Sequence, residues 1–216
     1  MNPVVLELPV DGPCLVQNSP ARRIPSHGTE LMGSSHAIDL VPVDARGRTT
    51  ARGAFAVVTP EPPDRFVGFG MPVLAPAAGR VAAVLDGAPD HAARRSLISL
   101  VPYALGQRRR LRAGVREIAG NHVVIELPGG VFVAVVHLRS GSLRVHVGDE
   151  VRAGQPIAAV GNSGNSTEPH VHLQAMDAAD PMLARGVPFV FRAFREGGVV
   201  HNGGLPREGA VISAVR

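Results

Sequence analysis

The sequence predicts a mainly β fold, an antiparallel sandwich or barrel, with one partly helical insertion. The 25 glycines and 19 prolines among the 216 residues are typical of many turns and short strands. From residue 121 onward, short apolar runs alternate with glycine-containing turns. No apolar run reaches the roughly 18 residues that span a bilayer, so we expect no transmembrane helix.

The elements are expected in the following order within one domain, residues 1–216. Residues 21–35 are predicted as a loop, "HAIDLVPVD" as a strand and "MPVLAPAAGRVAAVLDG" as two short strands. Residues 86–118 mix Ala, Leu and Arg at roughly helical spacing and are expected to form a helical insertion beside a cleft. "NHVVIEL" and "VFVAVVHL", joined by "PGG", predict a hairpin. Residues 186–216, with "VPFVFRAF" and "GAVISAV", are expected to form a C-terminal β extension.

Charge and cysteine content exclude several classes of protein. The net charge is +4, and every basic residue is an arginine. The run "QRRRLRAGVR" is interpreted as a solvated helical face, because aromatic residues that stack on bases are scarce, and no nucleic-acid partner is expected. Cys14 is the single cysteine, which excludes an internal disulfide and a cysteine-based metal site.

No signal peptide is recognised at the N-terminus, so the expected location is cytoplasmic, or secreted if the sequence is a trimmed mature form.

Two histidines in "NSGNSTEPHVHLQ" raise the question of function. On a strand, His170 and His172 point to one face and Val171 to the core. Such a pair can bind a metal, act in acid–base chemistry or simply face solvent. His137 closes the strand "VFVAVVH", and Asp39 lies in "HAID". Catalytic zinc is usually held by three histidine or carboxylate ligands, so these residues are candidate corners of one site.

The block "VVHLRSGSLRVHVGDEVRAGQPIAAVGNSGNSTEPHVHLQ" strongly resembles the lysostaphin/LytM-type zinc metallopeptidase family. It contains, in order, a histidine at a strand end, the pattern G-D-x-V-x-x-G-x-x-I and the segment G-x-S-G-x-S-T-x-P-H-x-H. "GFGMPVLAPAAGRVAAV" resembles a second family element, with Phe-Gly-Met where Gly-Thr is usual. The resemblance covers roughly residues 25–85 and 120–176 and implies the lysostaphin-type β sandwich (duplicated hybrid motif), in a subgroup with a helical insertion.

The resemblance also implies roles for single residues. His172 and Asp39 match zinc ligands, and His170 and His137 match two catalytic histidines. The family commonly has H-x-x-x-D for its remaining ligand, but position 35 is serine. His36 lies three residues before Asp39, which on a regular strand points it to the opposite face unless a β-bulge intervenes. His27, in "PSHGT", resembles the ligand of relatives in which a loop H-G-T precedes Y-A-I-D-F, so it is the favoured ligand, with His36 as the alternative.

The function implied is zinc-dependent endopeptidase activity: hydrolysis of a peptide amide bond, in peptidoglycan or a related small peptide, by metal-activated water with the two histidines. The alternative is a catalytically silent lysostaphin-type module that binds or activates another hydrolase. A biotinyl or lipoyl carrier is excluded, because the chain has no lysine to bear the cofactor. His122 and His146 are expected to be half-exposed, with His146 at the cleft rim. Asn162, Ser163 and Asn165 are expected to shape the loop that delivers His170.

Overall fold

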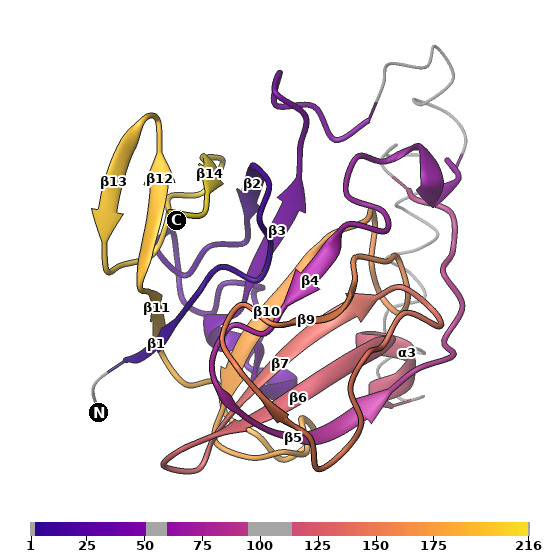
Figure 1. The fold of residues 1–216 in the computed structure, drawn as a ribbon, viewed down its shortest axis with the longest axis vertical. Coiled ribbons are helices and arrows are strands. Elements are labelled where there is room, and N and C mark those ends of the chain that lie inside the picture. Colours follow the sequence, from indigo (N-terminus) through magenta and orange to yellow (C-terminus); the bar gives the residue numbers. More distant parts are fainter. Residues whose placement is uncertain (1–2, 51–59, 95–113, 216) are drawn as a thin grey trace.

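A mainly β, antiparallel fold is confirmed by the computed structural model, which describes residues 3–50, 60–94 and 114–215 (Figure 1). One ten-stranded sheet runs through the molecule, and every neighbouring pair of strands in it is antiparallel. In sheet order its strands are β13 (Val199–Asn202), β12 (Ala193–Glu196), β14 (Val211–Ser213), β2 (Cys14–Gln17), β3 (Ile38–Pro42), β10 (Val171–Met176), β7 (Val131–Leu138), β6 (Asn121–Leu127), β5 (Gly79–Leu85) and β8 (Glu150–Val151).

Two short strand pairs complete the β structure of the described residues. The pair β4 (Pro72–Leu74) and β9 (Pro156–Ala159) is antiparallel, and it lies in front of β10 and β7 in Figure 1. The pair β1 (Val4–Leu6) and β11 (Phe189–Phe191) is parallel, which the sequence analysis did not foresee. Parallel pairing is available here because more than 180 residues of chain separate the two strands, far more than a crossover connection requires.

The two faces of the main sheet have different roles. On β7, Val133 and Val135 join the principal core, which β4 and β9 cover with Val73 and Ala158. The residues between them on β7, together with their neighbours on β6 and β10, form the opposite face. Strand alternation therefore supplies one sealed face and one face that is available for a site.

Helical structure is brief in the part of the chain that the structure describes. It consists of the 3-10 helices η1 (Leu31–His36) and η2 (Pro63–Arg65) and the α-helix α3 (Val115–Ala119). The predicted insertion is visible only at its ends, residues 86–94 and 114–118, because its centre, residues 95–113, lies outside the described residues. None of the described helices has the length and apolar character needed to cross a membrane.

Candidate metal centre

Asp39 and His172 are brought together by strand pairing. β3 and β10 are antiparallel neighbours, and Asp39 is the register partner of His172. Ile38 and Leu40 on β3, and Val171 and Leu173 on β10, face the core. Alternation therefore turns Asp39 and His172 to the open face, where His172 Nδ1 lies 2.9 Å from Asp39 Oδ1.

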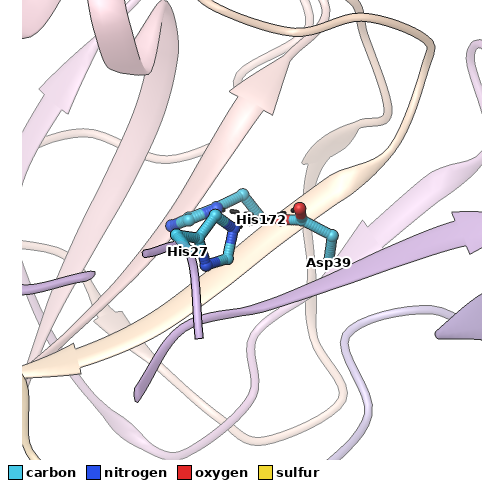
Figure 2. Close-up of side chains that lie close together, drawn as sticks. All are labelled: His27, Asp39 and His172. Carbon is cyan, nitrogen blue, oxygen red and sulfur yellow. Dashed lines mark hydrogen bonds and ion pairs between the residues drawn. The ribbon is translucent and has the colours of Figure 1, made fainter. Parts of the chain in front are cut away.

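His27 reaches the same carboxylate from the loop before η1. Its Nε2 lies 3.1 Å from Asp39 Oδ2, and the ligand atoms of His27, Asp39 and His172 all lie within 4.8 Å of one another (Figure 2). Its Nδ1 lies 3.1 Å from Ser26 Oγ. His27, the loop histidine favoured by the sequence, therefore lies beside Asp39 and His172.

His36, the alternative ligand, is not brought to this cluster. It ends η1, and its Nδ1 lies 3.0 Å from the hydroxyl of Ser35. Partial burial lowers the pKa of His36, and a hydrogen bond with the backbone of Gly186 opposes this effect. His36 lies in η1 rather than on β3, and it neither lines the cleft nor belongs to the group of possible ligand atoms.

His137 and His170 flank the cluster. Their ring centroids are 4.8 Å apart, and those of His137 and His172 are 5.9 Å apart. His170 Nε2 lies 3.5 Å from Asp39 Oδ1. The structure therefore gathers four of the predicted histidines around a single carboxylate.

A β-bulge turns His137 into the cleft. Val136 and His137 are consecutive on β7, yet both line the cleft. The register slips there, since Asn121 and His122 on β6 pair with Leu138 and Val136. His137 is the extra residue, with a φ of +63° in the left-handed region that non-glycine residues rarely adopt. The uninterrupted apolar run around His137 carries no sequence signal for this bulge.

The cleft beside these residues has a volume of about 340 Å³. One wall is apolar and is formed by Ile118, Ala119, Val124, Ala134 and Val136. His122 also lines the cleft and is buried, so the expectation that it is half-exposed was wrong. The bulge beside it and its hydrogen bond from Nδ1 to Gly120 O, 2.8 Å, hold the ring inside. His146 is fully exposed and does not line the cleft, so its expected place at the rim was also wrong.

Burial and mutual interaction shift the pKa values of this group. Burial opposes ionisation of Asp39, but His170 and His27 outweigh it and hold the pKa of the carboxyl well below its usual range. Burial also lowers the pKa of His170, yet the charge of Asp39 and a hydrogen bond to it raise that pKa overall. Burial, followed by the neighbouring His170 and His172, lowers the pKa of His137 well below its ordinary value. Asp39 is consequently an anion surrounded by imidazoles of unequal basicity.

The outer nitrogens of the histidines are tied to protein acceptors. His137 Nδ1 lies 2.9 Å from Ser163 O, and His170 Nδ1 lies 2.7 Å from Glu168 O. A carbonyl oxygen only accepts hydrogen bonds, so these ring nitrogens carry a proton, and in a neutral ring Nε2 then has the lone pair. In His27, Ser26 Oγ donates to Ser34 O and can therefore accept from Nδ1, with the same result.

This donor set fits a metal ion. Lone pairs of His27 and His170 lie 3.1 and 3.5 Å from the oxygens of Asp39. Acceptors that face one another in a buried site need a proton or a cation between them. Neutral imidazole and carboxylate are common ligands of divalent transition metals, so His27, Asp39 and His172 could hold one.

Two polar residues of the site were missed by the sequence analysis. Asn18 follows β2, adopts a φ of +53° and donates from Nδ2 to Asp39 Oδ2 at 2.7 Å. Gln174 follows His172 by two residues and places Oε1 2.9 Å from His172 Nε2. The spacing H-x-Q on one strand face was a usable signal for Gln174, whereas nothing in the sequence indicated Asn18.

The loop that delivers His170 is held on both sides. Ser163 Oγ donates to Leu138 O at 2.8 Å and accepts from Asn121 N at 3.0 Å. Asn162 Nδ2 donates to His91 O at 2.7 Å, and Asn165 N donates to Ile118 O at 2.8 Å. Each of the three loop residues singled out in the sequence therefore has a fixed contact.

A carboxylate surrounded by histidines on one face of an antiparallel sheet makes this β domain a candidate metal-binding protein. Residues 105–183 match the model of peptidase family M23. The match includes His137, His170 and His172, but it begins after His27 and Asp39 in the chain. In the folded chain, His27 and Asp39 contact His172, which lies within the matched residues, and they also contact each other.

Several solved structures are similar to this chain. The catalytic domain of the antimicrobial peptidase lysostaphin from Staphylococcus simulans is 21% identical over 73% of this chain and 80% of that chain, with a TM-score of 0.40. A variant of the catalytic domain of the prophage-encoded M23 protein EnpA from Enterococcus faecalis is 21% identical over 71% and 75%, also at 0.40. Csd3 from Helicobacter pylori is 16% identical over 86% of this chain but only 32% of its own, at 0.43. The likeness to peptidase family M23 rests on the family model and on the sequence motifs that the matched residues contain.

Proposed function

We propose that this chain is a zinc-dependent endopeptidase that hydrolyses a peptide amide bond in peptidoglycan or a related small peptide. His27, Asp39 and His172 are the proposed ligands, and His137 and His170 the proposed catalytic pair. The observation that carries the proposal is the buried carboxylate whose two oxygens are each approached by histidine nitrogens from separate elements. The match of residues 105–183 to a peptidase family model supports the reaction class.

The residues divide the chemistry between them. Zinc, when bound, would supply Lewis acidity that polarises the scissile carbonyl and makes a water molecule more acidic. His137 and His170 lie beside the ligand cluster with their Nδ1 protons already engaged, so their Nε2 atoms are free to take up and return a proton. The apolar wall formed by Val124, Ala134 and Val136 limits the access of bulk water to that side of the cleft.

Metal content tests the ligand assignment. Mass spectrometry of the purified protein should find near-stoichiometric zinc in the wild type and in His36→Ala, and little in His172→Ala or His27→Ala. His36→Ala is the matched control, because it removes a nearby imidazole that lies outside the cluster. Protein that stays free of metal after zinc is supplied would overturn the enzyme assignment and favour the silent binding module.

Hydrolysis tests the catalytic pair. His137→Ala and His170→Ala should retain zinc but release fragments from purified peptidoglycan, or from glycine-containing peptides, roughly 10²–10⁴-fold more slowly than the wild type. Full activity in both variants would contradict their proposed role. Stoichiometric zinc without hydrolysis of any peptide or peptidoglycan would also favour the silent module.

A further inference from the structure

Gln174 is buried beside the ligand cluster and contacts His172 along the strand face. Its Oε1 lies 2.9 Å from His172 Nε2, and its Nε2 donates to Met32 O at 2.8 Å. The side chain is 6% exposed and lines the cleft. A glutamine at this position satisfies two polar groups at once, one on η1 and one on β10.

The contact with Met32 fixes the orientation of the amide. The carbonyl of Met32 can only accept, so the NH₂ group of Gln174 must face it. The amide oxygen then faces His172, and this oxygen also only accepts. The proton between them consequently resides on His172 Nε2.

The position of this proton determines which ring nitrogen of neutral His172 can bind a metal ion. With the proton on Nε2, neutral His172 presents a lone pair from Nδ1, 2.9 Å from Asp39 Oδ1. The opposite tautomer would place an N–H on Nδ1, where it would bond to Asp39 and exclude a metal ion. A protein group that selects the tautomer of a ligand in this way typically changes metal affinity by roughly 10–100-fold when it is removed.

We propose that Gln174 is a positioning residue that holds His172 in its Nε2–H tautomer and so makes Nδ1 available to a divalent metal ion. This inference rests on the proposed function, because it assumes that His172 is a ligand. Gln174 itself does not touch the metal.

The variants separate this role from a purely structural one. Gln174→Met removes the acceptor for His172 and the donor to Met32, whereas Gln174→Glu keeps an acceptor for His172, loses the donor to Met32 and adds a negative charge. Zinc dissociation constants, measured by competition with a chromophoric chelator, should rise roughly 10–100-fold in Gln174→Met and stay near the wild-type value in Gln174→Glu. Gln155→Met, in the turn between β8 and β9, is the control for a glutamine whose Oε1 accepts from Arg152 N far from the site.

Equal weakening of zinc binding in Gln174→Met and Gln174→Glu would show that zinc affinity depends on the hydrogen bond to Met32 rather than on the acceptor for His172. That result would overturn the inference. Unchanged binding in Gln174→Met would do the same. Long-range ¹⁵N–¹H spectra of the zinc-loaded wild type give a test that needs no variant, and a proton on His172 Nδ1 rather than Nε2 would contradict the proposal even if Gln174→Met fails to fold. A wild type that binds no zinc at all would instead remove the proposed function.

Discussion

At the scale of single residues, the site depends on backbone conformations that side chains seldom adopt. His137 has a φ of +63°, where a residue with a Cβ is destabilised by about 1–2 kcal/mol relative to the right-handed region. This conformation is what places Val136 and His137 side by side in the cleft. Strain of this kind persists because the surrounding contacts hold it, here the hydrogen bond from His137 Nδ1 to Ser163 O.

The strain at His137 predicts a reversal of the usual order of alanine and glycine. At an ordinary strand position glycine is less stable than alanine by about 0.5–1 kcal/mol. At position 137 we expect His137→Gly to be more stable than His137→Ala by about 1 kcal/mol, because glycine tolerates positive φ. Urea denaturation of the two metal-free variants measures the difference. Alanine at least as stable as glycine would mean that the bulge relaxes on substitution.

The choice between His27 and His36 marks the limit of what spacing can predict for single residues. The spacing of three from His36 to Asp39 predicted opposite strand faces, and the structure places His36 in η1, outside the group of His27, Asp39 and His172. Spacing could not place His27, whose loop has no repeating pattern. The contact of His27 with Asp39 depends on the whole path from β2 to η1, which only the folded chain shows.

At the scale of elements, the loop of residues 161–170 is clamped between the two ends of the insertion. Gly164 and Gly120 approach so closely that a Cβ on either would collide with the backbone of the other segment. Asn121, at the start of β6, is fully buried, and its side chain bonds to both the insertion and the end of β7. Its side chain accepts from Ala88 N at 2.7 Å and donates to Ala88 O at 2.8 Å and Leu138 O at 3.0 Å.

Replacing Asn121 with alanine should loosen this clamp. It would leave the N–H and C=O of Ala88 without this partner and remove one of the two side-chain bonds to Leu138 O, and we expect a loss of about 2–4 kcal/mol in the free energy of unfolding. Hydrogen exchange should then rise first at the amides of residues 88–94 and 161–167, which bond to each other. Asn202→Ala, on the exposed strand β13, is the control and should change stability by less than about 0.5 kcal/mol. Exchange that rises evenly over the whole sheet would contradict a local clamp.

Regular elements were predictable from the sequence where the pattern was periodic. The hairpin of β6 and β7, strand β3 and strand β10 all occur where alternation and glycine turns indicated them. The bulge at His137 was not predicted, because an unbroken apolar run contains no glycine or polar residue to mark a change of register. The burial of His122 was missed for the same reason, since it lies opposite that bulge.

At the scale of the whole molecule, the C-terminal residues belong to the same sheet as the site. β14 pairs with β2, and β2 pairs with β3, which bears Asp39. Ser19, beside the Asn18 that donates to Asp39, bonds to Pro206 O and Glu208 Oε2, each at 2.7 Å. This order of strands could not be predicted from the sequence, because pairing between the two ends of the chain leaves no local pattern.

The strand order predicts that the C-terminal β extension is part of one folding unit and cannot be removed without loss. Deleting residues 192–216 exposes the core surface covered by Phe194 and Ile212, which contributes roughly 3–6 kcal/mol of hydrophobic burial. That amount approaches the whole stability of a typical domain, about 5–15 kcal/mol, so the shortened chain should unfold at a much lower temperature or fail to fold. Differential scanning calorimetry should show one transition for the full chain. Two transitions would show instead that the extension folds on its own. A shortened chain that keeps the wild-type melting temperature and zinc content would show that Asn18 holds Asp39 without support from residues 206–208.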